Sequence, residues 1–305
     1  MFTIWELILQ QTVNGLILGS FYALVALGYS MVYGIIKLLN FAHGDIFMVG
    51  AFVCFASFGV VSAALPGWPG IVISIVIAMI IAGIVGYLTQ RFAYRPLIKA
   101  AAPRLSLLIT AIGVSLIIYN AVMVITSSRT YFFQSGIEAA PLFQAGMFRL
   151  TDIQVILLTI SASLMAGLTL MIKKTMVGKA MRAIALDRDT CRLMGINVNK
   201  IIGVTFFIGS ALAAIASGMY NILYVNVSFS MGYMFGIKAF TAAVIGGIGS
   251  IPGAMLGGLL LGLLEAIGTQ FVGSQWKDVF AFGLLIVILI FRPNGLMGKT
   301  EIERM

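Results

Sequence analysis

Long, uninterrupted apolar runs constrain the fold of this 305-residue chain more than any other feature. A helix that crosses the hydrocarbon core of a bilayer needs about 20 mainly apolar residues. Eight runs are clear candidates for such helices, and a ninth, at about 235–250, is rich in glycine and is either a full span or a half-span. The runs predict an all-α fold, a polytopic transmembrane helical bundle of eight or nine spans, some of them broken. The eight clear candidates lie at about 8–34, 42–64, 70–90, 105–126, 152–172, 201–225, 253–272 and 277–291.

The composition excludes several other classes of protein. Charged residues make up 10% of the chain and hydrophobic residues 61%, and the mean hydropathy is +1.08. Soluble domains carry roughly a quarter charged residues, so a soluble enzyme, a disordered chain, a collagen and a disulfide scaffold are all excluded. Continuous apolar runs also disfavour a transmembrane β-barrel, whose strands alternate apolar and polar residues.

The runs follow one another without a long linker or a soluble domain, which predicts a single membrane domain over residues 1–305. The apolar stretch from Leu7 to Ile36 is too long for a signal-peptide core and is expected to be a retained first span. A structural disulfide is not expected, because Cys54 lies in an apolar run and Cys191 in a charged loop.

The distribution of basic residues predicts the orientation of the chain. Fourteen of the 19 Lys and Arg residues lie in 91–104, 173–200 and the tail, where they include Arg292, Lys299 and Arg304. The positive-inside rule places these segments in the cytoplasm, and 127–151 and the 65–70 turn outside. The N-terminus is then outside the cell if 235–250 crosses the whole membrane. It is inside if that stretch enters and leaves the membrane on the same side. The net charge of +9 thus marks a cytoplasmic face, and no nucleic-acid partner is expected.

The 173–200 segment carries two predicted short amphipathic helices. Gly178–Leu186 shows an apolar stripe at helical spacing. The second helix, Asp189–Met194, has an acid at its start and is followed by Gly195, as capping and dipole arguments favour. Two interpretations remain open: the helices lie on the anionic membrane surface, or they dock into a groove on a cytosolic partner.

The second of these helices carries the first family resemblance. Asp189-Thr190-Cys191-Arg192-Leu193-Met194-Gly195 resembles the coupling motif Glu-Ala-Ala-x-x-x-Gly of ATP-binding-cassette importer permeases, with Asp in place of Glu and Thr-Cys in place of Ala-Ala. The likeness extends along the chain in order. Residues 14–35, 38–52, 95–101, 236–266 and 291–298 resemble the LivH type of permease.

This resemblance implies one of the two different membrane subunits of a bacterial branched-chain amino acid importer, a multi-pass protein of the inner membrane. The implied partners are a second, LivM-like permease subunit, two cytosolic ATP-binding subunits and a periplasmic substrate-binding protein. Residues 175–200 would form the coupling loop, with Asp189, Thr190, Cys191 and Gly195 as coupling residues. The implied substrate is a branched-chain or related amino acid, although similar permeases move other amino acids, amides or urea.

The chain is therefore expected to be a transport subunit and no enzyme. No cofactor is expected on it, since ATP would be used by the partner subunits. Gly178-Lys179 is followed by Ala180, so the pattern of a phosphate-binding P-loop is not met.

Polar residues in the stretch KLLNFAHGD suggest part of a translocation path. In one interpretation Asn40–Asp45 is a break between half-helices, with His43 and Asp45 at membrane depth and Gly44 permitting close backbone approach. In the other, this stretch, Lys37 included, is a solvated cytoplasmic turn. His43 is expected to be hydrogen bonded structurally, and no metal site is expected because no second His or Cys lies nearby.

The run Gly246-Gly247-Ile248-Gly249-Ser250-Ile251-Pro252 predicts a second break, since three glycines and a proline do not continue a good helix. Non-helical backbone at membrane depth is buried in protein or lines an aqueous path, which makes Gly246, Gly247 and Gly249 path candidates. Lys238 is expected to extend its ammonium group to the interface. Glycines at four-residue spacing, such as Gly15 and Gly19, are expected to pack helices closely.

An ion- or proton-coupled secondary transporter of small polar solutes is the competing function. Its support is two acids, Asp45 and Glu265, which lie at or within apolar runs. A membrane-embedded enzyme is disfavoured, because the sequence shows no metal-ligand spacing, no Ser/His/Asp arrangement and no paired catalytic carboxylates.

Overall fold

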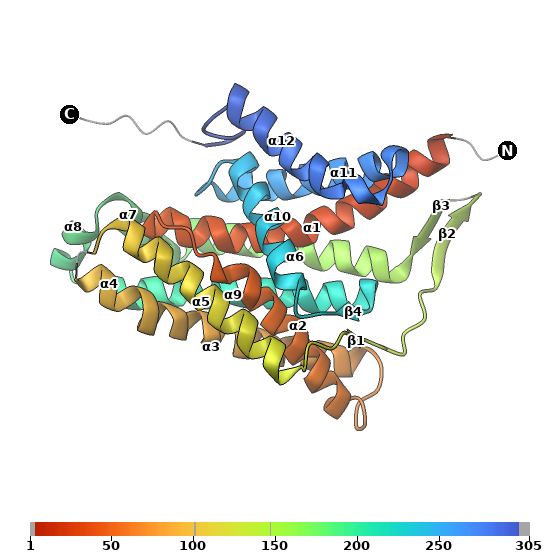
Figure 1. The fold of residues 1–305 in the computed structure, drawn as a ribbon, viewed down its shortest axis with the longest axis horizontal. Helices are drawn as coiled ribbons and strands as arrows, with labels where there is room; N and C mark the ends of the chain where they lie inside the picture. Colours follow the sequence, from red (N-terminus) through yellow and green to blue (C-terminus); the bar gives the residue numbers. More distant parts are fainter. Residues whose placement is uncertain (1–3, 101, 147, 299–305) are drawn as a thin grey trace. The chain divides into compact units, whose positions relative to one another are not determined.

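The structure is a computed structural model that describes residues 4–100, 102–146 and 148–298 (Figure 1). Within these residues, eight helical runs are long and apolar enough to cross a membrane, as the sequence predicts. The shorter α10 (Met231–Gly246) has 16 residues and corresponds to the ninth candidate. The runs are α1 (Ile4–Ile36), α2 (Ala42–Val61), α3 (Trp68–Thr89) with its extension to Lys99, α5 (Arg104–Ile125), α6 (Asp152–Lys174), α9 (Val198–Tyr224), α11 (Ile251–Val272) and α12 (Lys277–Phe291) with the short turn Ser274–Trp276 before it.

The 91–104 segment differs from its predicted loop. The α3 run continues through a π-helical turn, Gln90–Tyr94, into α4 (Arg95–Lys99). Pro96 lies directly after the π-helical turn, at the start of α4, and the helical run continues past it. Arg91, Arg95 and Lys99 therefore lie on the end of a long helix, whereas Arg104 begins α5.

The 127–151 segment contains strands that the sequence did not predict. β1 (Tyr131–Phe132) pairs antiparallel with β4 (Asn226–Val227), and β2 (Pro141–Ala145) pairs antiparallel with β3 (Phe148–Thr151). Each sheet has two short strands, so the fold remains a helical one.

The chain forms two compact units. Among the described residues, the first unit contains 4–30, 138–166 and 238–298, and the second contains 31–137 and 167–237. α1, α6 and α10 are continuous across these boundaries.

The second unit is built on three helices, α2, α3 and α9, which pack against one another, with α5 against α2. Small residues allow the backbones to approach: a Cβ built on Gly50 of α2 would lie 2.7 Å from the Cα of Ala214 in α9. Phe47 stacks on Phe235 with ring centroids 4.5 Å apart. This core is dense enough to hold polar groups at fixed positions.

The first unit packs α1 directly on α11. A Cβ on Gly19 would lie 2.9 Å from the carbonyl oxygen of Gly258, and one on Gly262 would lie 2.2 Å from the amide nitrogen of Gly19. Gly15 meets the same face, so the predicted packing role of glycines at four-residue spacing is confirmed here.

The C-terminal end of α1 lies beside the predicted coupling loop. Nη2 of Arg188 donates to the carbonyl oxygen of Ile35 at 3.0 Å. A continuous helix of 33 residues is about 50 Å long, so its two ends reach opposite sides of a bilayer about 30 Å thick. If 173–200 is cytoplasmic, as the distribution of basic residues predicts, the Ile4 end of α1 is expected outside, and this favours the alternative in which the α10 stretch crosses the membrane.

Candidate functional site

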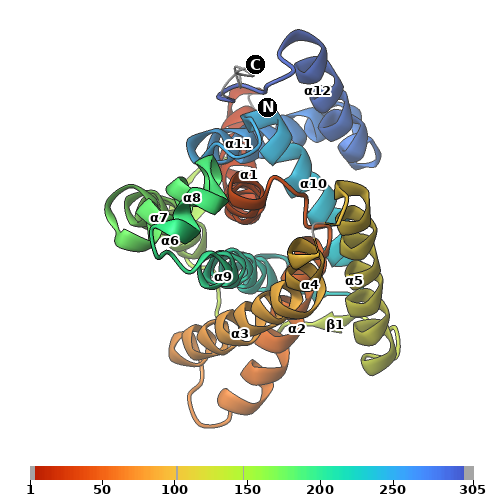
Figure 2. The ribbon, with the colours of Figure 1, turned by 90° about the vertical axis from the view of Figure 1, so that its left-hand side faces the viewer.

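The 173–200 segment folds into two short helices, α7 (Met176–Leu186) and α8 (Arg188–Leu193), beside the start of α9 (Figure 2). The predicted helices are confirmed to within two residues. The acid that caps α8 is Asp187 and not Asp189. Oδ1 of Asp187 accepts the amide N–H groups of Asp189 at 2.9 Å and Thr190 at 3.2 Å, and its Oδ2 accepts the Thr190 hydroxyl.

Buried side chains and two arginines attach this loop to the ends of the spans. Met181, Ile184 and Cys191 are buried. Arg182 donates to the carbonyl oxygen of Ile172, and Arg188 donates to that of Ile35. The loop is therefore attached to the ends of α1 and α6.

Four long apolar side chains of the loop remain exposed. Their exposed fractions are 78% for Met176, 89% for Leu186, 87% for Leu193 and 77% for Met194. We call these four residues the exposed apolar set. Such side chains are suited to insert into an apolar groove of a partner or into a membrane surface. These are the two interpretations that the sequence leaves open.

The four residues to which the resemblance assigns a coupling role differ in their exposure to solvent. Asp189 and Thr190 are exposed, and Asp189 pairs with Arg192 at 2.9 Å on the surface. Gly195 is exposed, has a φ of +81° and ends the α8 segment. Cys191 is buried against the protein, so its side chain fixes the helix while the other three face outwards.

Two ionisable groups of the loop have shifted pKa values. The pKa of Asp187 is lowered from 3.8 by the hydrogen bonds from the Thr190 side chain and from the Thr190 and Asp189 amides. The pKa of Arg188 is lowered by partial burial and by the nearby charge of Arg192, while Asp189 opposes the shift. Both groups are charged at neutral pH.

A second set of candidate residues surrounds the start of α2, in the second unit. Asn40, His43 and Asp45 are buried and Lys37 is exposed, so a wholly solvated turn is wrong for the first three. The hydroxyl of Tyr94 donates to Oδ1 of Asn40 at 3.1 Å, and the hydroxyl of Ser115 donates to Oδ2 of Asp45. The break itself covers residues 37–41, because α2 begins at Ala42.

Gly44 makes the close backbone approach that the sequence predicts. A Cβ built there would lie 2.5 Å from both the carbonyl oxygen of Gly232 and the Cα of Gly236, at the start of α10. Backbone atoms do not yield as a flexible side chain would. Gly44 is thus required for α2 to contact this part of α10.

The break predicted at 246–252 is a turn at 247–250 between α10 and α11, in the first unit; Gly246 ends α10, and Ile251 and Pro252 begin α11. Gly247 and Gly249 have φ values of +103° and +88°, and Ser250 caps α11 by accepting the Gly253 amide at 3.3 Å. The segment after α12 covers this turn, because Leu296 and Met297 donate their amides to the carbonyl oxygens of Ile245 and Gly246 at 2.9 Å. Gly246 and Gly247 are buried and Gly249 is exposed.

A buried charge cluster in the first unit was not predicted. Nζ of Lys238 lies 2.9 Å from Oε1 of Glu265 and 3.0 Å from Oδ1 of Asp278. Glu265 is fully buried and also contacts Lys277 at 3.3 Å and the hydroxyl of Tyr22 at 3.0 Å. The expectation that Lys238 extends to the interface is wrong: its side chain is buried, and an acid 27 positions away in sequence neutralises it.

Of the basic tail, Arg292 follows α12 and is exposed, while Lys299 and Arg304 lie outside the described residues.

Comparison with known proteins supplies the family. The sequence profile described as "Branched-chain amino acid transport system / permease component" matches residues 11–289. The chain is 44% identical to the high-affinity branched-chain amino acid transport system permease protein BraD of Pseudomonas aeruginosa, over 97% of both chains. It is 40% identical to the corresponding protein LivH of Escherichia coli K12, also over 97% of both chains.

A more distant similarity covers part of the chain. The permease protein LivM of the E. coli high-affinity branched-chain amino acid transport system is 27% identical over 48% of this chain and 36% of LivM. The sequence is therefore similar to both LivH and LivM of E. coli, whose names assign them to the same kind of transport system.

Proposed function

Since the chain belongs to the family of branched-chain amino acid transport system permease components, we propose that it is the translocation subunit of an ATP-driven importer of branched-chain or related amino acids. The chain is a multi-pass protein of the inner membrane, in agreement with its family and its eight apolar helical runs. The proposal concerns the energy source, the substrate and the partners.

The coupling loop is the observation that carries the ATP-driven part of this proposal. Its helices are attached to the spans by Arg182 and Arg188, while the exposed apolar set and three coupling residues, Asp189, Thr190 and Gly195, face outwards. Such an element is suited to receive a movement on one side and to transmit it to the ends of α1 and α6. A helix that only lay on the membrane would not need two anchored arginines.

The proposed partners follow from this arrangement and from the relatives. Two cytosolic ATP-binding subunits would dock on the coupling loops, a second LivM-like permease subunit would complete the membrane assembly, and a periplasmic substrate-binding protein would deliver the amino acid. We propose that this chain binds no cofactor and has no ATPase site of its own, since ATP would be bound and hydrolysed by the partner subunits.

Asn40, His43, Gly44 and Asp45 remain candidates for the translocation path. The three polar side chains are buried, and the Asn40 Nδ2 has no hydrogen-bond partner among the described residues. An unpaired donor in a buried position is costly unless water or a solute reaches it. Of the glycine candidates, exposed Gly249 fits a path better than Gly246 and Gly247, which the chain itself covers.

The competing function, an ion- or proton-coupled transporter, has less support. Glu265 is held by two ammonium groups and a tyrosine hydroxyl, so it is poorly placed to exchange a proton or an ion. Asp45 is then the remaining acid for such a role. Continued transport in the Asp45→Asn, Glu265→Gln double variant would remove this alternative.

Reconstitution tests the proposed function. Proteoliposomes that contain the two permeases and the ATP-binding subunits should take up radiolabelled leucine when ATP and the binding protein are present. Omission of the ATP-binding subunits should abolish uptake. Leucine uptake by this chain alone, without ATP, would refute the proposal.

A further inference from the structure

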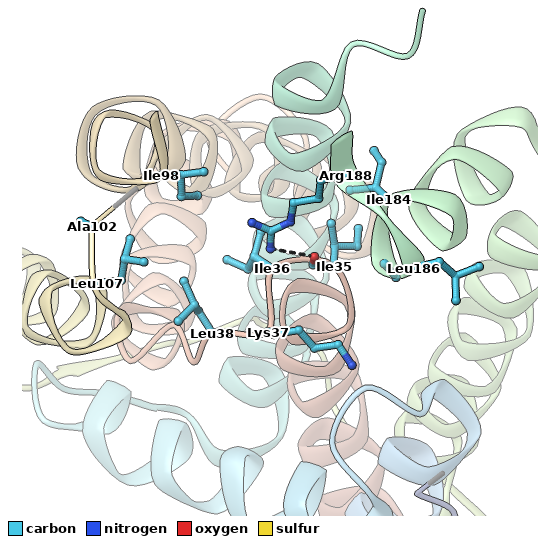
Figure 3. A pocket seen from close by; sticks show the side chains of 11 residues that line it. Ile35, Ile36, Lys37, Leu38, Ile98, Ala102, Leu107, Ile184, Leu186 and Arg188 are labelled. Atoms are coloured by element: carbon cyan, nitrogen blue, oxygen red, sulfur yellow. Dashed lines mark hydrogen bonds between the residues drawn. The ribbon is translucent and has the colours of Figure 1, made fainter. Parts of the chain in front are cut away.

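A pocket of about 380 Å³ opens where three segments of the second unit meet (Figure 3). The first segment is the end of α1 with the turn after it, the second joins α4 to α5, and the third joins α7 to α8. All three lie on the cytoplasmic side by the orientation derived above. The volume is within the range of small-molecule sites.

The walls of this pocket are mainly branched aliphatic side chains. Ile35, Ile36 and Leu38 come from the first segment, Ile98 and Leu107 from the second, and Ile184 from the third. Polar atoms line this pocket at least as much as apolar ones, so a matching ligand has a small aliphatic part together with polar groups that pair with the walls.

The charged groups of the pocket are cationic. Lys37 and Arg188 line it, and none of its described lining residues is acidic. The Arg188 guanidinium is fixed by the Ile35 carbonyl oxygen at 3.0 Å, which uses one of its five N–H donors. A fixed, half-buried guanidinium beside an aliphatic wall is suited to a carboxylate.

The backbone conformation of Lys37 is a second, independent indication of a ligand site. It has a φ of +54°, and its amide donates to the Tyr33 carbonyl oxygen at 2.8 Å, so it forms the left-handed C-terminal cap of α1. Glycine is the residue preferred in this conformation, and a lysine there is strained. Strained non-glycine residues are concentrated at ligand sites, where the side chain is needed despite the backbone.

The C-terminal end of α1 favours the positively charged ammonium group of an amino acid. The last turn of a helix presents carbonyl oxygens and the negative end of the helix dipole, and both favour a cation. An α-amino acid has a carboxylate for Arg188 and an ammonium group for this helix end.

We propose that this pocket is a cytoplasmic-side binding site for a small aliphatic carboxylate, occupied in the cell by the imported amino acid. The identity of the occupant rests on the proposed function, whereas the ligand chemistry rests on the pocket. A ligand here contacts α1, α5 and the α7–α8 loop together. Its binding stabilises one position of the coupling loop, so accumulated product slows the transport cycle.

Binding to the purified assembly of permeases and ATP-binding subunits, without the binding protein, tests this site. The probes are L-leucine, 4-methyl-2-oxopentanoate, leucinamide and inorganic phosphate. Leucine should bind saturably and the oxo acid should compete with it, because both have the aliphatic body and the carboxylate. Leucinamide, which lacks the carboxylate, and phosphate, which lacks the body, should not compete.

Three variants locate the site. Arg188→Gln should weaken leucine binding about tenfold or more, as loss of a charged hydrogen-bond partner does. Ala102→Phe should abolish binding by filling the pocket, which Ala102 lines. Lys37→Gly removes the cation but suits the positive φ, so affinity should fall while the melting temperature does not. Lys99→Gln, an exposed neighbour outside the lining, is the control and should bind like the wild type.

The outcomes separate the two proposals. If the complete transporter imports leucine, but leucine binding is absent or unchanged in all three variants, the pocket proposal is wrong and the proposed function stands. If the transporter does not import leucine, yet the oxo acid binds and loses affinity in Arg188→Gln, the proposed function is wrong for this substrate and the carboxylate site stands. Competition by leucinamide or phosphate as strong as that of leucine would overturn the assigned ligand chemistry.

Discussion

The Nζ of Lys238 lies 2.9 Å from Oε1 of Glu265, and both side chains are buried in a chain that spans a membrane. The pair joins α10, the helix too short for a standard span, to α11, and Asp278 and Lys277 extend it to α12. We interpret the cluster as the attachment of α10 to the helices of its unit. Burial of single charges in apolar surroundings is costly, so the pair must be kept or lost together.

Replacement of one member of this pair should destabilise the protein more than replacement of both. Glu265→Gln leaves the buried Lys238 ammonium with the half-exposed Asp278 as its partner and should cost about 1–3 kcal/mol, the usual cost of removing one hydrogen-bond partner of a buried polar group. The Lys238→Met, Glu265→Gln double variant should recover part of this loss. Thermal unfolding in detergent measures both, and additive losses in the double variant would contradict the coupling.

Gly44→Ala should impair folding and assembly. The added methyl carbon would lie 2.5 Å from backbone atoms of Gly232 and Gly236, which cannot move away independently. Gly113→Ala, at a position with no atom within 4 Å of the built Cβ, is the matched control and should keep or slightly raise stability. Equal melting temperatures for Gly44→Ala and the wild type would show that the contact is not tight.

Gly195 should resist β-branched substitution, because its φ of +81° is a left-handed conformation. Gly195→Val should reduce ATP-dependent uptake while leaving membrane insertion intact. Gly195→Asn, which tolerates this conformation, should retain most of the uptake. If the valine variant transports and copurifies with the ATP-binding subunits like the wild type, Gly195 has no coupling role.

Asp187 should hold α8 in place throughout the physiological pH range. Since its folded-state pKa is lowered below 3.8, its stabilising effect is complete above that value and is lost only as pH falls through the folded-state pKa. Amide exchange at Asp189 and Thr190, corrected for intrinsic rates, should show constant protection from pH 8 to pH 5. Asp187→Ala should lose this protection, and Asp187→Asn, a good neutral cap, should retain it. Protection that is lost between pH 7 and pH 5 would contradict the cap.

The spans could be predicted from the sequence, because a helix in lipid satisfies its own backbone and needs only length and apolar residues. The turn at 247–250 could also be predicted, since glycine and Pro252 break helices locally. The cap at Asp187 had a readable signal as well, an acid directly before a short helix with Thr190 three positions later.

Other features depend on contacts distant in sequence. Lys238 and Glu265 are 27 positions apart, and only the packing of α10 on α11 joins them. Likewise β1 meets β4 across almost a hundred residues, and the pocket at the end of α1 requires three loops to converge. Neither hydropathy nor local propensity contains information on such contacts, so the sequence alone predicts Lys238 at the interface.

In the proposed function, the exposed apolar set of the coupling loop binds in a groove of an ATP-binding subunit and transmits its movement to the spans. The Leu193→Asp, Met194→Asp double variant places two charges on this surface, where both side chains are more than three quarters exposed and contribute little to the fold itself. Copurification of the ATP-binding subunits and ATP-dependent leucine uptake should be measured on the same preparation. We predict that both are lost while the protein remains inserted and folded. Wild-type copurification together with wild-type uptake would show that this surface does not bind the ATP-binding subunit.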